Sequence, residues 1–138
     1  MNNPYNWGGT LNYSTEEQVV GTWIDGKPLY QKCYQGVFPS TLGPGIVIGN
    51  ISDILDYAAS DVTITKITGM VNWSAGSTYG TVSIPYYLDN PSSSGYTGNW
   101  IALYTDTSVG KIKANIGTTS PVKNCPYMLV IQYIKTTD

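Results

Sequence analysis

The sequence predicts an all-β fold, either an antiparallel β-sandwich or a jelly roll, with one short helix near residues 51–58. Two observations predict the strands: hydrophobic and polar residues alternate in several short runs, and Gly, Pro, Asn or Asp residues separate these runs. About seven to nine short strands with turns between them are typical of two-sheet β architectures. We expect one domain over residues 1–138, with residues 1–12 as a candidate extended N-terminal arm.

The first expected element is a β-hairpin. Residues 19–24 and 29–34 are rich in β-forming side chains, and Asp25-Gly26-Lys27-Pro28 separates them. Asp-Gly is a strong hairpin signal because glycine accepts the positive φ that such a turn requires. Proline lacks an N–H donor, so Pro28 suits the start of a strand or an edge. These residues therefore predict two antiparallel strands with a tight turn.

One helix is expected after the hairpin. Ile51, Ile54, Leu55 and Ala58 follow the spacing i, i+3, i+4 and i+7, which places them on one helical face. No other segment has this pattern, so the rest of the chain is expected to form strands and loops.

The later strands are predicted from alternation. Residues 62–65 and 82–84 alternate apolar and polar side chains, with a bulge expected near residues 66–67. Residues 111–116 alternate in the same way and should point three apolar side chains inward. The run 127–134 is nearly continuous in apolar residues, which predicts a central strand covered on both faces.

Charge and cysteine content exclude several classes of function. The net charge is −2, so the chain offers no basic surface for nucleic acid, and we expect no nucleic-acid partner. Its longest wholly apolar run is too short to span a bilayer, so no membrane insertion is expected. Cys33 and Cys125 lack the spacing of a zinc or redox site and are expected to be buried thiols.

The residues available for catalysis are few. Histidine is absent, which removes the usual general base and the commonest zinc ligand. A pair of carboxylates remains possible, as in glycosidases, but turns or helix positions explain several of them. We therefore expect no enzymatic activity, no metal and no cofactor. The carboxylates considered are Glu16, Glu17, Asp25, Asp53, Asp56, Asp61, Asp89 and Asp106.

Aromatic composition indicates a recognition surface. The chain has 12 Tyr and 4 Trp but one Phe, and Tyr and Trp suit surfaces that are partly apolar and partly wet. Tyr96, Trp100, Asp89, Asn90 and Asn99 combine rings with hydrogen-bonding groups around one polar loop, and they are the candidate ligand-binding residues. Core packing or a subunit interface is the alternative for each ring. A second, weaker group comprises Trp73, Tyr79, Tyr86 and Tyr87.

Two strings at opposite ends of the chain resemble a known family. Residues 13–32, YSTEEQVVGTWIDGKPLYQK, and residues 131–138, IQYIKTTD, resemble segments of bacteriophage tail-fibre and minor structural proteins. The resemblance implies a β-rich receptor-binding tip domain, assembled as a homotrimer, that meets the bacterial surface and often its glycans. It implies a location in the virion, in the fibre or tail, after assembly in the host cytoplasm. It transfers no contact residue, because the family's middle region varies.

Three functions are compatible with these residues. The first is a homotrimeric phage fibre tip, joined to the rest of the fibre or virion, whose loops bind a host glycan or another host receptor. The second is a structural role as a capsid decoration, a baseplate part or a trimerisation module. The third, ranked last, is a polysaccharide depolymerase.

Overall fold

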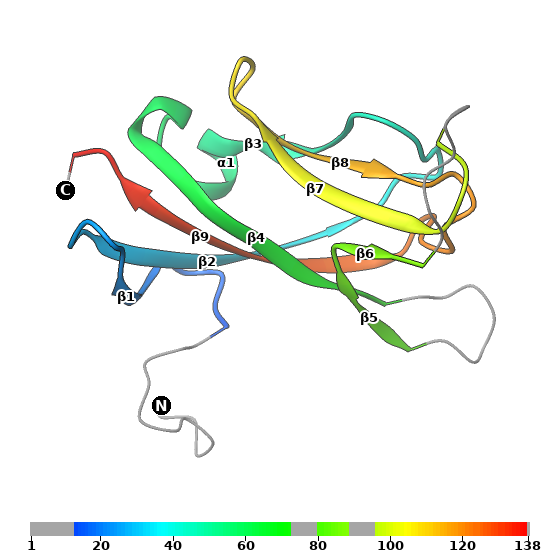
Figure 1. Cartoon of the computed structure of the whole chain (residues 1–138), viewed down its shortest axis with the longest axis horizontal. Coiled ribbons are helices and arrows are strands. Elements are labelled where there is room, and N and C mark those ends of the chain that lie inside the picture. Colours follow the sequence, from blue (N-terminus) through cyan, green and yellow to red (C-terminus); the bar gives the residue numbers. More distant parts are fainter. Residues whose placement is uncertain (1–12, 73–79, 89–95, 138) are drawn as a thin grey trace.

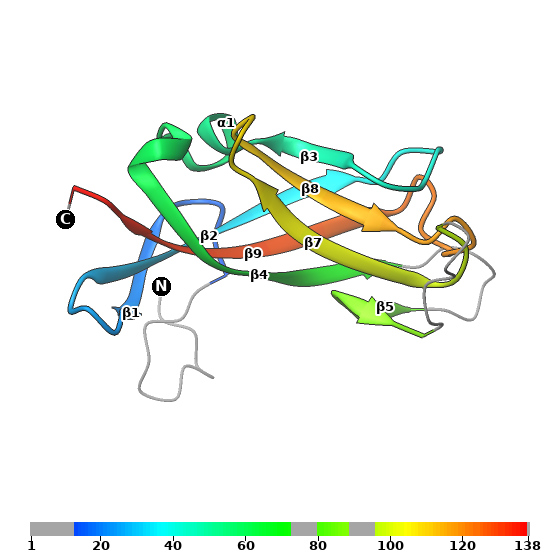
Figure 2. The same ribbon diagram turned by 45° about the horizontal axis from the view of Figure 1, so that its top comes forward.

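The computed structural model describes residues 13–72, 80–88 and 96–137, and there it confirms the predicted all-β sandwich. Two antiparallel sheets lie face to face (Figures 1 and 2). One sheet has the strand order β1-β2-β9-β4-β5 and the other has the order β3-β8-β7-β6. The strands are β1 (Gln18–Thr22), β2 (Pro28–Val37), β3 (Ile46–Asn50), β4 (Val62–Asn72), β5 (Thr81–Ile84), β6 (Tyr86–Tyr87), β7 (Trp100–Asp106), β8 (Lys111–Ile116) and β9 (Pro126–Lys135).

The predicted hairpin is confirmed as β1 and β2, which pair antiparallel. Gly26 has a φ of 88°, and the Trp23 N–H donates to the Lys27 carbonyl at 2.8 Å across the turn. The Asp25 carboxylate accepts a bond from the Lys27 N–H at 3.0 Å. Pro28 begins β2, where its missing N–H breaks no interior ladder bond.

The predicted helix is shorter in the structure. The α-helix α1 covers Ile51–Leu55, and Asp56 ends it in a left-handed conformation with a φ of 65°. Ile51, Ile54 and Leu55 are buried, but Ala58 is exposed and precedes a 3₁₀ turn, η1 (Ala59–Asp61). The predicted short helix near residues 51–58 is therefore confirmed, but it ends at Leu55, because apolar spacing alone does not indicate where the backbone reverses.

The alternating strands behave as predicted. Ile112, Ala114 and Ile116 of β8 are fully buried, and the polar residues between them are half-buried. The bulge in β4 falls between Ile64 and Lys66, beside the predicted position. Bulges also interrupt β1 between Val19 and Gly21, and β3 between Val47 and Gly49. The inward rows of both sheets form one buried core that includes the only phenylalanine, Phe38. Both cysteines are buried free thiols, as expected.

Strand β9 is central, and its outer face is partly covered. It pairs with β2 on one side and with β4 on the other. Leu129 and Ile131 point into the core and are fully buried. On the other face Met128, Val130 and Gln132 are half-buried and Ile134 is buried, so the predicted cover of both faces is confirmed only in part for the described residues.

A charged cluster joins the segment before β1 to the end of β9. The Lys135 Nζ lies 3.1 Å from the Glu17 carboxylate and 4.0 Å and 4.4 Å from the ring centres of Tyr30 and Tyr57. The Tyr133 hydroxyl donates to the same carboxylate. Burial alone would lower the pKa of Lys135, but hydrogen bonds with Tyr57 and Glu17 outweigh it and raise the pKa above its ordinary value. The cluster therefore holds a charged lysine among aromatic rings.

Gly69 of β4 is a site where any side chain should destabilise the sheet. A Cβ there would stand 2.1 Å from the carbonyl oxygen of Met128, which belongs to the backbone of the central strand. Gly69→Ala should lower the free energy of unfolding by about 1–3 kcal/mol, measured by urea denaturation. Gly21→Ala is the control, because its Cβ would meet nothing within 4 Å. Equal stability of the two variants would contradict this packing.

Candidate ligand-binding site

An aromatic cluster lies on the outward face of the four-stranded sheet, and we call Tyr87, Tyr96 and Trp100 the aromatic platform. Tyr87 of β6 and Trp100 of β7 are directly opposed in the register of the two strands. Their rings stack with centroids 6.0 Å apart and planes 3° apart. Such cross-strand aromatic pairs contribute to sheet stability. The ring of Tyr96 packs on Trp100 at 5.5 Å with a tilt of 32°.

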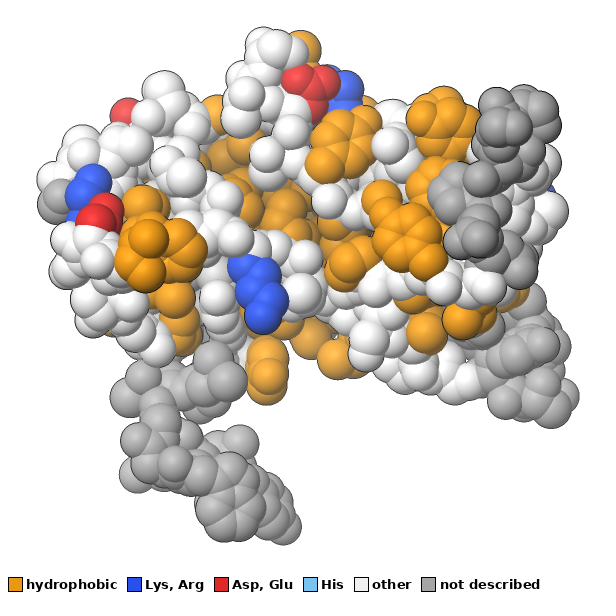
Figure 3. Space-filling view, in the orientation of Figure 1, with side chains coloured by type: hydrophobic (Ala, Val, Ile, Leu, Met, Phe, Trp, Pro, Cys, Tyr) orange, Lys and Arg blue, Asp and Glu red, His pale blue; other side chains and the backbone are white. Residues whose placement is uncertain are grey.

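The two tyrosines carry the exposed surface of the platform. Tyr87 is 58% exposed and Tyr96 is 37% exposed, whereas Trp100 is only 4% exposed. Trp100 is buried beneath these rings and apart from the core between the sheets. Figure 3 shows hydrophobic side chains gathered at the end of the molecule where Figure 1 places β6 and the start of β7. Trp100 therefore supports the surface that Tyr87 and Tyr96 present.

The turn before β7 is held by several hydrogen bonds. The indole N–H of Trp100 donates to the Thr97 carbonyl at 3.0 Å. The Thr118 N–H donates to the Tyr96 carbonyl at 2.6 Å, and the Gly117 N–H donates to the Trp100 carbonyl at 2.9 Å. The buried Ser120 hydroxyl oxygen accepts from the Trp100 backbone N–H at 3.0 Å. These bonds fix the position of Tyr96 relative to the strands, so the platform is preorganised.

Asn99 has a positioning role beneath the platform. Its side-chain oxygen accepts a hydrogen bond from the Tyr86 hydroxyl at 2.6 Å, and its backbone carbonyl accepts from the Leu88 N–H at 3.0 Å. Burial raises the pKa of Tyr86, with a smaller opposing contribution from a hydrogen bond with Ser120. Tyr86 therefore stays protonated at neutral pH and can donate to Asn99.

The structure brings together three of the five residues expected from the sequence. Tyr96, Asn99 and Trp100 lie in one turn and the strand that follows it, with Tyr96 exposed, Asn99 half-buried and Trp100 buried. Asp89 and Asn90 lie outside the described residues, as do Trp73 and Tyr79 of the second group.

In the sequence, Tyr87 belongs to the weaker group of candidates, and no pattern singles out Leu88. Both are exposed, Tyr87 opposite Trp100 and Leu88, at 61%, where its N–H donates to the Asn99 carbonyl. The adjacent pair Tyr86-Tyr87 indicates that one of the two rings points outward, since neighbouring residues in a strand point to opposite faces. Only the pairing of β6 with β7 shows that Tyr87 is the outward member.

The platform suits a ligand with a flat apolar face and hydroxyl groups. Tyr87 and Tyr96 present ring surface together with phenol hydroxyls, which donate and accept hydrogen bonds. Of the carboxylates considered for catalysis, Glu17, Asp56 and Asp106 form ion pairs with Lys135, Lys32 and Lys113. Within the described segments, no group of three or more His, Cys, Asp or Glu side chains could hold a metal ion.

The chain was compared with family models, curated proteins and solved structures, and none of them matches it. In the part of the chain that the structure covers, no helix has the length and apolar character needed to cross a membrane.

Substitutions should distinguish the contribution of the buried Trp100 ring to stability from that of the exposed Tyr87 ring. Trp100→Ala should lower the free energy of unfolding by about 3–5 kcal/mol, because it leaves a large cavity. Tyr87→Ala should cost about 1 kcal/mol, the value of an exposed cross-strand aromatic pair. Urea denaturation of both variants measures the difference. A Trp100→Ala protein as stable as Tyr87→Ala would show that Trp100 does not support the platform.

Proposed function

We propose that this chain is a receptor-binding tip domain of a bacteriophage fibre or related tail protein, and that it binds a glycan of the bacterial surface. The exposed aromatic platform is the observation that carries the binding proposal. A pyranose ring would stack its C–H face on Tyr87 or Tyr96, while phenol and amide groups hydrogen-bond its hydroxyls.

The resemblance at the two ends of the chain supports the fibre part of the proposal. The string over residues 13–32 contains β1, the turn and the first half of β2, and the string over residues 131–138 contains the end of β9. These segments pair directly, since β2 lies beside β9. Glu17 and Tyr30 from the first string meet Tyr133 and Lys135 from the second in the charged cluster. The paired end segments would form a framework that family members share, and the ligand surface lies outside it. This arrangement fits a family whose middle region varies.

A structural role is the second candidate, and the same surface favours it. Tyr87 and Leu88 are more than half exposed, and an exposed apolar surface of this kind also suits a contact between subunits. A baseplate part, a capsid decoration or a trimerisation module would use the platform in this way. The two candidates differ in what the platform contacts, a glycan or a neighbouring subunit.

Binding to an array of bacterial surface polysaccharides tests the glycan proposal. Tyr87→Ala and Tyr96→Ala should each weaken binding about tenfold, the effect of losing about 1.4 kcal/mol of contact energy. Tyr13→Ala is the matched control, because Tyr13 is 66% exposed and lies against the other sheet. Full binding by folded Tyr87→Ala and Tyr96→Ala proteins would remove the platform as the site, and no binding by the unmodified chain would remove the glycan proposal.

Solution mass tests the assembly. A fibre tip should form a stable homotrimer, so light scattering should give about three times 15.0 kDa. A stable monomer at micromolar concentration would contradict the trimer. If Tyr87→Ala lowers the mass of the assembly, the platform is a subunit contact and the structural role is favoured.

A further inference from the structure

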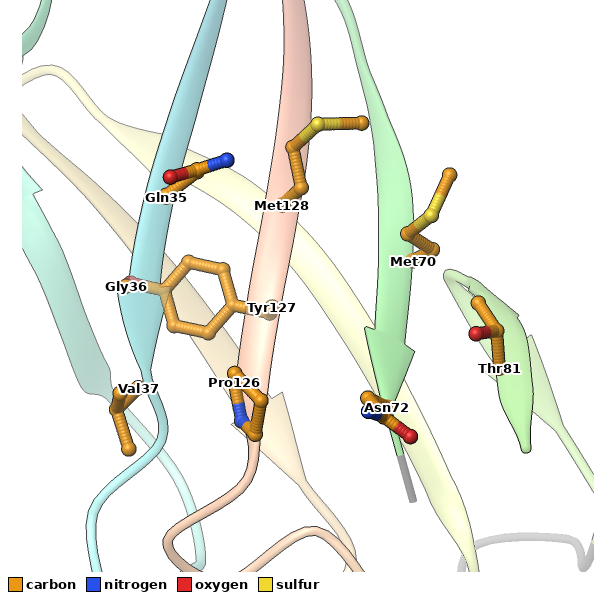
Figure 4. A pocket seen from close by; sticks show the side chains of 9 residues that line it. All are labelled: Gln35, Gly36, Val37, Met70, Asn72, Thr81, Pro126, Tyr127 and Met128. Carbon is orange, nitrogen blue, oxygen red and sulfur yellow. The ribbon is translucent and has the colours of Figure 1, made fainter. Parts of the chain in front are cut away.

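The outward face of the five-stranded sheet has two adjoining hollows, of about 510 Å³ and 650 Å³, which share Met70 and Met128. We call them together the outer groove. Figure 4 shows Met128 and Met70 next to one another on β9 and β4 in the first hollow. The aromatic platform belongs to the other sheet, so the outer groove is a separate surface.

The floor of the outer groove is apolar. Met70 is 41% exposed, and Met128 and Val130 are half-buried in the central strands. Methionine side chains are flexible and polarizable, so they adapt to the shape of an apolar partner. Because the removal of such a surface from water is favourable, the floor favours an apolar occupant.

A bulge places one cation beside this floor. Among the described residues that line the outer groove, Lys66 carries the only charge. The register of β4 with β9 shifts between Ile64 and Lys66, so that Lys66 pairs with Gln132. Without the extra residue, Lys66 would stand opposite Ile131, which is buried in the core. Lys66 is exposed, and the ion pairs of the described residues do not include it.

The complementary groups stand at the turn between β1 and β2, where we call Ile24 and Asp25 the hairpin tip. Ile24 is 91% exposed, the largest exposed fraction among the described large hydrophobic side chains. Asp25 follows it and is exposed as well, so an apolar side chain and a carboxylate are neighbours. Asp25-Gly26 accounts for the turn, whereas nothing in the described residues buries Ile24.

Hydrogen bonds hold the hairpin tip in one conformation. The Trp23 N–H donates to the Lys27 carbonyl at 2.8 Å, and the Gly26 N–H donates to the Trp23 carbonyl at 2.9 Å. The Lys27 N–H donates to the Asp25 carboxylate at 3.0 Å. A rigid tip loses little conformational freedom when it docks. The same rigidity keeps it out of the groove of its own chain, so its partner must be another molecule.

From these observations we propose that the hairpin tip of one copy docks in the outer groove of a second copy. Ile24 of the first copy lies against Met128 and Val130 of the second. Asp25 of the first copy pairs with Lys66 of the second. Each half of the contact supplies what the other lacks, an apolar knob with an anion on one side and an apolar floor with a cation on the other.

The spacing within the outer groove matches the spacing at the tip. Val130 pairs with Thr68, which lies two residues from Lys66 along β4. Two residues of a strand span about 7 Å. Ile24 and Asp25 are consecutive, with Cα atoms about 3.8 Å apart, and the flexible lysine side chain spans the remaining distance.

The contact joins two different surfaces, so it is head-to-tail. Repeated contacts of this kind close into a ring when the rotation between copies allows it. A ring of three copies is the homotrimer of the proposed function, on which this inference rests for its stoichiometry. The aromatic platform stays outside the contact and remains open to a ligand.

Charge reversal across the contact tests the ion pair. Asp25→Lys and Lys66→Asp should each raise about tenfold the protein concentration at which half of the assembly dissociates, because like charges then face each other. The double variant should return to within about threefold of the unmodified chain. Asp25→Lys also removes the bond from the Lys27 N–H, but so does the double variant, so its recovery separates the contact from the turn. Sedimentation velocity over a dilution series measures the assembly.

Two control substitutions accompany the reversals. Lys123→Asp changes an exposed lysine that lines neither hollow, and it should leave the assembly unchanged. Ile24→Ser should weaken the assembly about tenfold, because it removes the apolar knob. Val109→Ser is its matched control, since Val109 is 53% exposed in the turn between β7 and β8. Circular dichroism checks that every variant is folded.

The outcomes separate this contact from the proposed function. A trimer that Asp25→Lys, Lys66→Asp and Ile24→Ser leave unchanged would overturn the contact alone. A double variant that stays dissociated would overturn it as well. A chain that is monomeric at every concentration would overturn both the contact and the trimer. Recovery of the double variant in an assembly of another size would support the contact and contradict only the number of copies.

Discussion

The central position of β9 is the constraint on which the rest of the structure depends. This strand is hydrogen-bonded along its length to β2 and β4, so it joins the N-terminal hairpin to the middle of the chain. Its inward side chains supply much of the core, and Lys135 at its end fixes Glu17 ahead of β1. The four-stranded sheet packs against the inward face of the sheet that β9 holds together.

The features that the sequence predicted are those set by neighbouring residues. The Asp25-Gly26 turn and the alternation in β8 depend on local backbone and side-chain preferences, and Tyr96, Asn99 and Trp100 are grouped because they are close in the chain. Tyr87 joins them only through the pairing of β6 with β7, which no local pattern specifies. The length of α1 depends on the reversal at Asp56, and the burial of the outer face of β9 depends on what packs against it.

The two ends of the chain and the aromatic platform lie on different sheets. Residues 13–32 and 131–138 contribute strands to the five-stranded sheet, whereas the aromatic platform lies on the four-stranded sheet and the turn before β7. Trp100 and Asn99 hold the platform from below through ring contacts and hydrogen bonds that do not involve β2 or β9. Side chains on the platform can therefore change while the pairing of the end segments stays intact.

The edges of both sheets are poor templates for aggregation. Bulges interrupt edge strands β1 and β3, and the other two edge strands, β5 and β6, have four and two residues. A long, flat edge invites strands of another molecule to extend the sheet, and short or bulged edges discourage this. Many copies of this domain can thus be crowded together, on one particle or during synthesis, without merging into continuous intermolecular sheets.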